Sequence, residues 1–324
     1  MTELKYIIGG SASSGSSFLV NMLGRHSEIY AGPETNILTH PEWMMNWANR
    51  EKHTSGVFFD RKLSQAWHVH RGIQYDHLIK REELISHFAS ASSFDEFISH
   101  CFGPICSVNT ASIYAEKTPS NAAYFHLHDE LFPSAHKILT IRNPLDAIAS
   151  MVRRGWSIPY AVGLYLFNIS IGYHSDFKRT IIRYEDLIDG PEDVTSSILA
   201  LENLIFEKDM LSDENQQTIS SWVQYKDGQS TRTFDMIKPI QKQMILHLIY
   251  NMKFKEDFQF YGKTPSFSSI IEICDLFDYN VDVAYPKKWE LNIRAQALFL
   301  LEKWKRRLRS YPLSGENFPL ELKS

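Results

Sequence analysis

The sequence predicts an α/β protein in three layers, with a central, mainly parallel sheet flanked by helices. Two observations carry this prediction. Short runs rich in Ile, Val, Leu and Tyr alternate with helical patterns, and glycine or proline marks many of the boundaries between them. In parallel sheets of this kind, ligands bind beyond the carboxyl ends of the strands. The predicted strands are residues 4–8, 112–115, 137–141 and 179–183.

Helical patterns follow most of these strands and complete the alternation. Apolar residues recur on one face of the pattern at residues 191–204, and residues 239–252 are amphipathic too, which is typical of helices that cover a sheet. The predicted helices are residues 16–24, 144–154, 157–177, 191–204 and 239–252.

The chain has 324 residues, which is ample for a large hydrophobic core. We expect an α/β domain over residues 1–262 and a C-terminal helical extension over residues 263–324, where the alternation ends. An insert of helical pattern, residues 35–111, separates the first two strands and is rich in aromatic residues. Most of these side chains are expected in the core, and a ligand pocket among them is the alternative.

The composition argues against several classes of protein. The net charge of -4 lacks the basic excess of a nucleic-acid-binding protein. The three cysteines have no CxxC spacing, which argues against a disulfide framework and a zinc site and indicates reduced thiols. No apolar run approaches the ~18 residues of a membrane helix, and no signal-peptide pattern opens the sequence. We therefore expect a cytoplasmic protein with no membrane span and no nucleic-acid partner.

The stretch from Gly10 to Ser17 has the glycine spacing of a phosphate-binding loop, GxxxxGK[ST]. Glycines let backbone N–H groups surround an anion, and the start of the next helix adds partial positive charge. Ser16 stands where such a loop carries the lysine that grips a nucleoside triphosphate. The loop therefore predicts a P-loop-like fold that binds a phosphate or sulfate, and it weakens the triphosphate interpretation.

Residues 137–155 form a second strand–turn–helix pattern. Asn143 can cap the helix and Pro144 suits its first position. Helix capping does not explain Arg142 at the end of the strand or Ser150 about two turns into the helix. An arginine fork and a hydroxyl are together suited to a phosphate.

These two elements resemble those of the sulfotransferases that use 3′-phosphoadenosine 5′-phosphosulfate (PAPS). That family binds the 5′-phosphosulfate with a loop rich in serine, threonine and glycine, and the 3′-phosphate with an Arg-x₇-Ser element. The element corresponds here to Arg142 and Ser150. The loop corresponds to Ser13, Ser14, Gly15, Ser16 and Ser17.

Two further motifs extend the resemblance to about residues 5–262. RYEDL, residues 183–187, resembles the family's recurring YEDL, which implies that Tyr184 lies near the adenine. EKTPSN, residues 116–121, resembles the EK[ST]P stretch of the carbohydrate and tyrosylprotein branches. The resemblance implies a PAPS-dependent enzyme that passes a sulfuryl group to a hydroxyl or amine and leaves 3′,5′-ADP.

The resemblance also implies catalytic roles. Ser13 stands where the family's loop normally opens with a basic residue, so Lys117 is the candidate substitute cation. Glu34 follows the first helix and a turn, as the catalytic glutamate does in the tyrosylprotein branch, and is the candidate base. His40 is the alternative base.

The family needs no metal, and the residues predict none. Two histidine pairs have a spacing that would share a face on a strand, but both lie in helical patterns. These pairs are His68–His70 and His126–His128.

Two alternative functions stay open at this point. One is a P-loop kinase-like phosphotransferase, against which Ser16 argues. The other is a non-catalytic nucleotide-binding protein, which Ser13 favours. The acceptor, whether saccharide, small molecule or peptide, is not readable from the sequence, and a homodimer is an open possibility.

Overall fold

The computed structural model describes residues 3–32, 34–53, 79–173, 179–211, 233–281, 293–298, 300–301 and 320–322. They belong to two compact units, each assembled from segments that are distant in the sequence. The first unit comprises Met1–Gly10, Gly15–Thr140 and Lys178–Gln229. The second unit comprises Ser11–Ser14, Ile141–Phe177 and Ser230–Ser324.

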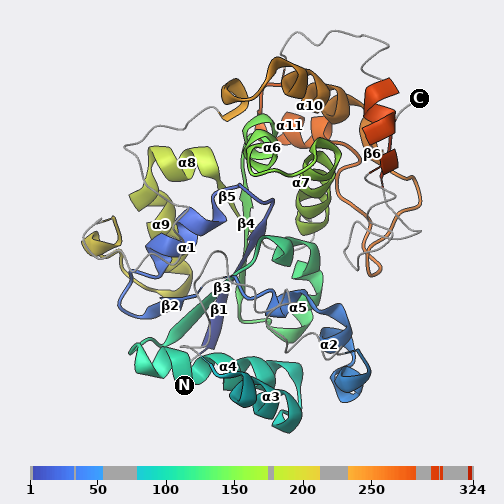
Figure 1. Cartoon of the computed structure of the whole chain (residues 1–324). Coiled ribbons are helices and arrows are strands. Elements are labelled where there is room, and N and C mark those ends of the chain that lie inside the picture. Colours follow the sequence, from blue (N-terminus) through green and yellow to red (C-terminus); the bar gives the residue numbers. More distant parts are fainter. Residues whose placement is uncertain are drawn as a thin grey trace. The chain divides into compact units, whose positions relative to one another are not determined.

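The first unit is built on a five-stranded sheet in the order β2-β3-β1-β4-β5 (Figure 1). β1 pairs in parallel with β3 and β4, and β2 pairs in parallel with β3. The predicted parallel α/β sheet is therefore confirmed, with β2 as a strand that the sequence pattern missed. The strands are β1 (Glu3–Gly10), β2 (Ile29–Ala31), β3 (Ile113–Lys117), β4 (His136–Ile141) and β5 (Thr180–Arg183).

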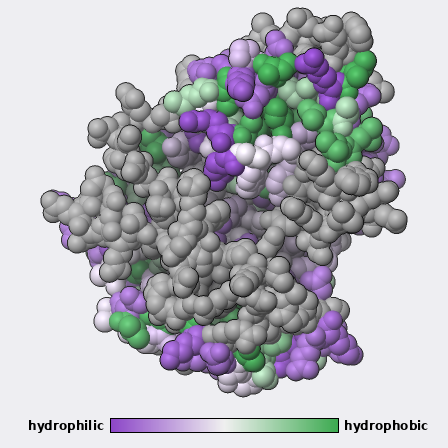
Figure 2. All heavy atoms as spheres, viewed as in Figure 1, coloured by the Kyte–Doolittle hydropathy of each residue, from purple (hydrophilic) through white to green (hydrophobic). Residues whose placement is uncertain are grey.

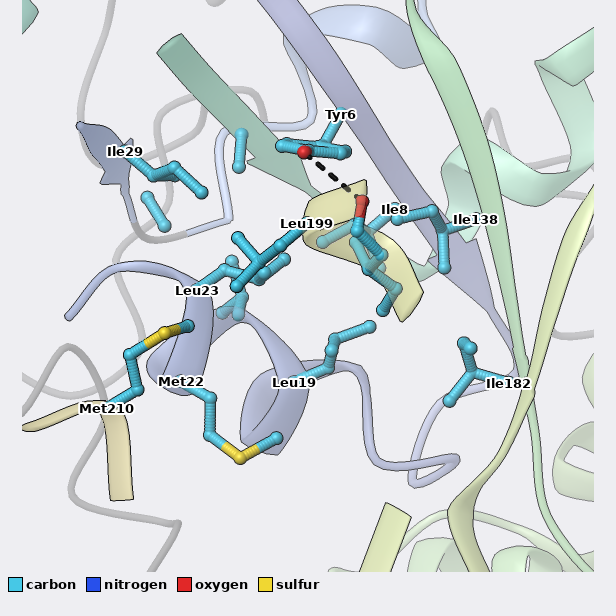
Figure 3. Packing of buried hydrophobic residues seen from close by; sticks show 14 of the residues in the cluster. Tyr6, Ile8, Leu19, Met22, Leu23, Ile29, Ile138, Ile182, Leu199 and Met210 are labelled. Atoms are coloured by element: carbon cyan, nitrogen blue, oxygen red, sulfur yellow. Dashed lines mark hydrogen bonds between the residues drawn. The ribbon is translucent and has the colours of Figure 1, made fainter. Parts of the chain in front are cut away.

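One face of the sheet is covered by α1 (Ser16–Leu23), α8 (Tyr184–Asp189) and α9 (Pro191–Leu199) (Figure 1). Tyr6 and Ile8 share one face of β1 because side chains alternate along a strand. They belong to one buried cluster with residues of α1 and α9, so they point to this face of the sheet (Figure 3). The predicted helix 191–204 was too long. α9 ends at Leu199 and a 3₁₀ turn follows, which leaves Ile205 83% exposed.

The other face is covered by α4 (Phe94–Val108), the 3₁₀ helix η5 (Pro119–Tyr124) and α5 (Phe125–Leu131). The ring of Phe102 on α4 stacks on Tyr114 of β3, with 4.0 Å between the centroids. η5 lies so close to β1 that a Cβ on Gly9 would come within 2.3 Å of its backbone. Helices on both faces complete the three layers that the sequence predicts.

The insert between β2 and β3 is helical where it is described, as the sequence predicts. Its helices are η1 (Ile37–Thr39), α2 (Pro41–Met45), η2 (Trp47–His53), α3 (Arg81–Ser90) and α4. Five aromatic side chains pack edge to face, tilted or stacked in its buried core: Trp43, Trp47, Phe88, Phe94 and Phe97. For these residues the core interpretation is confirmed. Residues 54–78, which include His68 and His70, lie outside the described residues.

The described part of the second unit is mainly helical. α6 and α7 begin directly after Asn143 and Ser157, with proline in the first turn of each. Hydrophilic and hydrophobic residues are interspersed on the part of this unit that appears at the top of Figure 2. The domain boundary at residue 262 stays a prediction. The helices are α6 (Pro144–Arg153), α7 (Ile158–Gly172), η8 (Thr233–Met236), α10 (Pro239–Asn251) and α11 (Ile270–Phe277).

This unit also contains a small antiparallel pair, β6 (Met252–Phe254) with β7 (Leu320–Leu322). Across the described ranges of both units, no helix combines the length and apolar character needed to cross a membrane.

Candidate active site

The loop between β1 and α1 is shaped by Gly15. Its φ of 91° is a left-handed conformation that favours glycine, and a Cβ there would come within 2.5 Å of the Tyr184 ring. Tyr184 is the first residue of α8 and directly follows β5. The structure therefore brings two predicted ligand-binding residues together and explains why no larger residue fits at position 15.

The serines of the loop differ in their surroundings. Ser14 is buried, and both its backbone N–H and its hydroxyl donate to the carbonyl oxygen of Ser11, at 3.3 Å and 2.6 Å. Ser16 and Ser17 lie in the first turn of α1, where backbone N–H groups have no partner within the helix. This is the part of the loop that suits an anion.

Ser17, Glu34 and Lys117 form a cluster in the first unit, which we call the lysine cluster. The Lys117 Nζ donates to Glu34 Oε1 at 2.5 Å and to Ser17 Oγ at 3.0 Å. The Lys117 side chain is 5% exposed and the Glu34 side chain 24%. Three sequence-predicted residues thus meet at one point, because the parallel strands β1, β2 and β3 end at the same edge of the sheet.

Glu116 lies beneath this cluster, and the sequence reasoning gave it no role. It is buried, and its carboxylate accepts hydrogen bonds from Thr35 Oγ1 at 2.7 Å, Thr118 Oγ1 at 2.8 Å and Asn121 Nδ2. Burial raises the pKa of Glu116, whereas these hydrogen bonds act to lower it. Because Thr35 is the neighbour of Glu34, the network fixes the loop that carries the candidate base.

The alternation of side chains in β3 explains how one motif serves two purposes. Ile113 and Ala115 face α1 and the buried cluster of Figure 3, and Lys117 faces the same side. Glu116 faces the opposite side, toward η5. The alternation in EKTP was the signal from which the buried role of Glu116 could have been inferred.

In the second unit, Arg142 and Arg154 both donate to Ser13, and we call these three residues the arginine cluster. Arg142 is buried, and its Nη1 donates to the Ser13 carbonyl at 3.4 Å while its Nη2 donates to Thr233 Oγ1 at 3.3 Å. Its own carbonyl accepts a hydrogen bond from the Tyr165 hydroxyl at 2.7 Å, which fixes the backbone at the end of β4.

Arg154 is the second functional candidate that the sequence reasoning missed. It caps the C-terminus of α6, is exposed, and donates from Nη2 to the Ser13 hydroxyl. Its position one helical turn after Ser150 was the available signal, because residues four apart lie on one face of a helix.

His40, the alternative base, has a different environment. It stands between η1 and α2, and its ring stacks on Trp43 with 4.3 Å between the centroids. Burial lowers the pKa of His40 to about 4, so the imidazole is neutral near pH 7. The stacking gives His40 a packing role in the insert, whatever part it has in catalysis.

The residues that the structure describes contain no group of three or more His, Cys, Asp or Glu side chains that could hold a metal ion. His126 and His128 lie on α5, as their helical pattern predicts. His128 is buried and its Nε2 hydrogen-bonds to the Leu38 carbonyl at 2.8 Å, which ties α5 to η1.

A glycine- and serine-rich loop between a parallel strand and a helix is suited to a phosphate- or sulfate-bearing ligand. A family model described as the sulfotransferase family matches residues 6–208. The match covers more than half of the chain, so the chain belongs to the sulfotransferase family. It is accordingly an enzyme that transfers a sulfuryl group to an acceptor, and the family generally uses PAPS.

Solved structures give a similar fold. The sulfotransferase domain of the Synechococcus PCC 7002 olefin synthase is 16% identical, covers 86% of this chain and 96% of its own, and has a TM-score of 0.52. The sulfotransferase domain from the curacin biosynthetic pathway is 18% identical, covers 92% and 98%, and has a TM-score of 0.45. The fold comparison rests on the first of these. No curated protein matches the chain significantly.

Proposed function

We propose that this sulfotransferase uses PAPS as its sulfuryl donor, releases 3′,5′-ADP, and needs no metal. The observation that carries the proposal is the lysine cluster, in which Lys117, Glu34 and Ser17 combine a cation, a carboxylate and a hydroxyl within hydrogen-bonding distance. A cation and a base are the two groups that sulfuryl transfer to a hydroxyl requires.

The residues present fit a nucleotide that carries several negative charges. Gly15 turns the backbone through a left-handed conformation at the start of α1, and because it has no Cβ the ring of Tyr184 lies against the loop. Lys117 and Arg142 are buried cations at the carboxyl ends of β3 and β4, in a protein whose net charge is -4. Each of these cations follows or ends a parallel strand, and ligands of parallel sheets bind beyond the carboxyl ends of the strands.

Each predicted residue has a proposed part in holding the donor. The loop from Ser13 to Ser17 binds the 5′-phosphosulfate through backbone N–H groups and hydroxyls. Arg142 and Ser150 bind the 3′-phosphate, for which a guanidinium fork is well suited. Tyr184 contacts the adenine, a role that the family resemblance supports.

Lys117 is suited to bind both Glu34, the proposed general base, and the sulfuryl donor. An ammonium has three N–H donors, of which Ser17 and Glu34 take two in the described contacts. The third can contact the bridging oxygen of the donor. Lys117 then neutralises the negative charge that gathers on the departing phosphate, a contribution that is strongest in a site of low exposure.

Glu34 is suited to take the proton of the acceptor. A carboxylate is a group that accepts a proton in general base catalysis, and Glu34 Oε1 accepts a hydrogen bond from Lys117 Nζ at 2.5 Å. PAPS supplies the sulfuryl group, whose sulfur bonds to the acceptor oxygen as its bond to the phosphate oxygen breaks. Glu34 leaves this step as a neutral carboxyl, so the charge of Lys117 is then matched to the phosphate rather than to Glu34.

Calorimetry in the presence of EDTA tests the donor assignment. We expect 3′,5′-ADP to bind without a divalent metal. Binding of ATP with magnesium, and none of 3′,5′-ADP, would instead support the kinase-like alternative. Tight binding of 3′,5′-ADP without any turnover would favour the non-catalytic alternative.

Arg142→Ala tests the 3′-phosphate assignment in the same experiment. The variant should lose about 1.5–3 kcal/mol of binding free energy for 3′,5′-ADP, the scale of a hydrogen bond to a charged group. Affinity for adenosine 5′-phosphosulfate, which lacks the 3′-phosphate, should change little. Equal losses for the two ligands would show that Arg142 is a structural residue.

The acceptor is proposed only by its chemistry, as a hydroxyl or amine of a saccharide, small molecule or peptide. Cytoplasmic location and a homodimeric state stay predictions.

A further inference from the structure

Ser13 is contacted by two guanidinium groups, although it carries no charge itself. Arg142 donates to its carbonyl oxygen and Arg154 to its hydroxyl. Ser13 has a φ of 68°, a left-handed conformation that is uncommon for a residue other than glycine, asparagine or aspartate. Its hydroxyl and its carbonyl thus each hold a different arginine beside the anion-binding loop.

We propose that Arg154 supplies the positive charge that the loop lacks at position 13, and that it binds the 5′-phosphosulfate end of the donor. The inference rests on the proposed use of PAPS. It assigns a donor-binding role to a residue outside both the loop and the Arg142–Ser150 element. Arg154 stands at the C-terminal end of α6, in the same unit as Ser13.

Backbone hydrogen bonds fix the main chain at Arg154, and a ring contact orients its side chain. The N–H of Arg154 bonds to the carbonyl oxygens of Ser150 and Met151, at 3.3 Å and 3.1 Å. The guanidinium lies over the ring of Trp156, with its Cζ 5.4 Å from the centroid. Stacking of this kind orients a guanidinium, whose planar fork donates its hydrogen bonds in the plane of the group.

The neighbouring Arg153 provides a matched control. It is also exposed and carries the same charge, but its Nη1 contacts Met236 Sδ at 3.2 Å rather than the loop. Replacing either arginine by alanine changes the net charge by the same amount. Any difference in ligand binding between the two variants therefore reports position rather than overall charge.

Exposure gives the proposal a second, independent signature. Arg154 is exposed whereas Arg142 is buried. Salt screens interactions of exposed charges much more than those of buried charges. The contribution of Arg154 to binding should therefore shrink as ionic strength rises, while that of Arg142 should persist.

The test is calorimetry on the full chain, with 3′,5′-ADP and adenosine 5′-phosphosulfate as probes. Arg154→Ala should raise the Kd of both ligands about 5- to 20-fold at low salt. This is more than the loss of an exposed ion pair causes and less than the loss of a buried charge-assisted hydrogen bond. Arg153→Ala should leave both values near those of the unchanged protein. In 0.5 M salt the effect of Arg154→Ala should fall to about twofold or less.

A rescue variant separates charge from structure. Adding Ser13→Lys to Arg154→Ala places the cation in the loop itself, and most of the lost affinity should return. Thermal melting of each variant confirms that it is folded. Failure of this rescue in a folded double variant would contradict the proposal that charge is what Arg154 contributes.

Two other results would overturn the assignment. Equal affinities of Arg154→Ala and Arg153→Ala would show that Arg154 has no part in binding. A loss confined to 3′,5′-ADP would place Arg154 at the 3′-phosphate instead. If the unchanged protein binds neither probe, the proposed use of PAPS fails, and this inference fails with it.

Discussion

Ser17, Glu34 and Lys117 come from three separate segments, and their contact depends on side-chain direction as well as on strand order. Lys117 is the last residue of β3 and shares a face with Ile113 and Ala115, and on that side its ammonium reaches Ser17 of α1. Glu34 reaches the same ammonium from the loop after β2. The two charges hold each other at a position where only Glu34 has appreciable exposure.

Glu34→Gln keeps the shape of the side chain and removes the base. We expect turnover on a hydroxyl acceptor to fall roughly 10²–10⁴-fold, the usual scale for loss of a general base, while affinity for 3′,5′-ADP is kept. An amine acceptor needs less help in losing its proton, so the effect should be smaller there. Steady-state turnover and calorimetry measure the two quantities. Near-normal turnover on a hydroxyl acceptor would exclude Glu34 and make His40 the next residue to replace.

At this scale the sequence predicted residues that belong to a motif and missed residues whose roles depend on tertiary contacts. Glu34 and Lys117 were proposed through the resemblance to family motifs, and Arg142 through its place at the end of a predicted strand. Arg154 was missed because its role depends on a contact with Ser13, far away in the sequence. Glu116 was missed because the motif was considered for its lysine alone.

Among the elements, the stretch that joins β3 to η5 carries the support of the site. Its motif, EKTPSN, supplies the buried acceptor Glu116 and two of its donors, Thr118 and Asn121. A third donor, Thr35, comes from the loop after β2. Together with the hydrogen bond from the Asn36 N–H to Thr118 Oγ1 at 3.1 Å, this network links the loop after β2 to the stretch after β3.

Glu116→Gln places an amide where these donors converge. An amide group brings its own N–H donors to a site already filled with donors, so part of the network is left unpaired. We expect the free energy of unfolding to fall by about 1–3 kcal/mol, and turnover to fall more than affinity for 3′,5′-ADP, because the loop of Glu34 loosens. Glu130→Gln on the exposed side of α5 is the control. Chemical denaturation that gives equal stabilities for the two variants would be evidence against this support.

Helices and strands were predictable where they were long enough to show a clear hydrophobic periodicity. Four strands and the helices α1, α6, α7 and α10 lie close to their predicted positions. β2 has three residues, too few for a periodic pattern to emerge. The helix at residues 191–204 was overextended because Ile205 continues the apolar period although tertiary packing leaves it exposed.

At the scale of the whole molecule, histidines in the described core should make stability depend on pH. Burial lowers the pKa of His40 to about 4 and that of His128 to about 3. The unfolded chain takes up protons near pH 6.5, before the folded chain does. Stability contributed by these groups is therefore present above pH 6.5 and is lost as pH falls toward the folded values.

We expect the melting temperature to drop as the pH falls from about 6.5 to 5. Over this range each such histidine lowers the free energy of unfolding by about 1.4 kcal/mol per pH unit. His40→Phe preserves stacking on Trp43 and removes the titrating group, so it should flatten the curve. His100→Gln, at a partly exposed position on α4, serves as the control. A pH dependence unchanged by His40→Phe would contradict the assignment.

The most direct test of the whole proposal is sulfuryl transfer from labelled PAPS to a panel of hydroxyl and amine acceptors in EDTA. We expect the unchanged protein to move label to at least one acceptor, and Lys117→Ala to retain little of this turnover because its cation is lost. A protein that binds 3′,5′-ADP but transfers label to no acceptor, or one that is fully active as Lys117→Ala, would contradict the catalytic role of the lysine cluster.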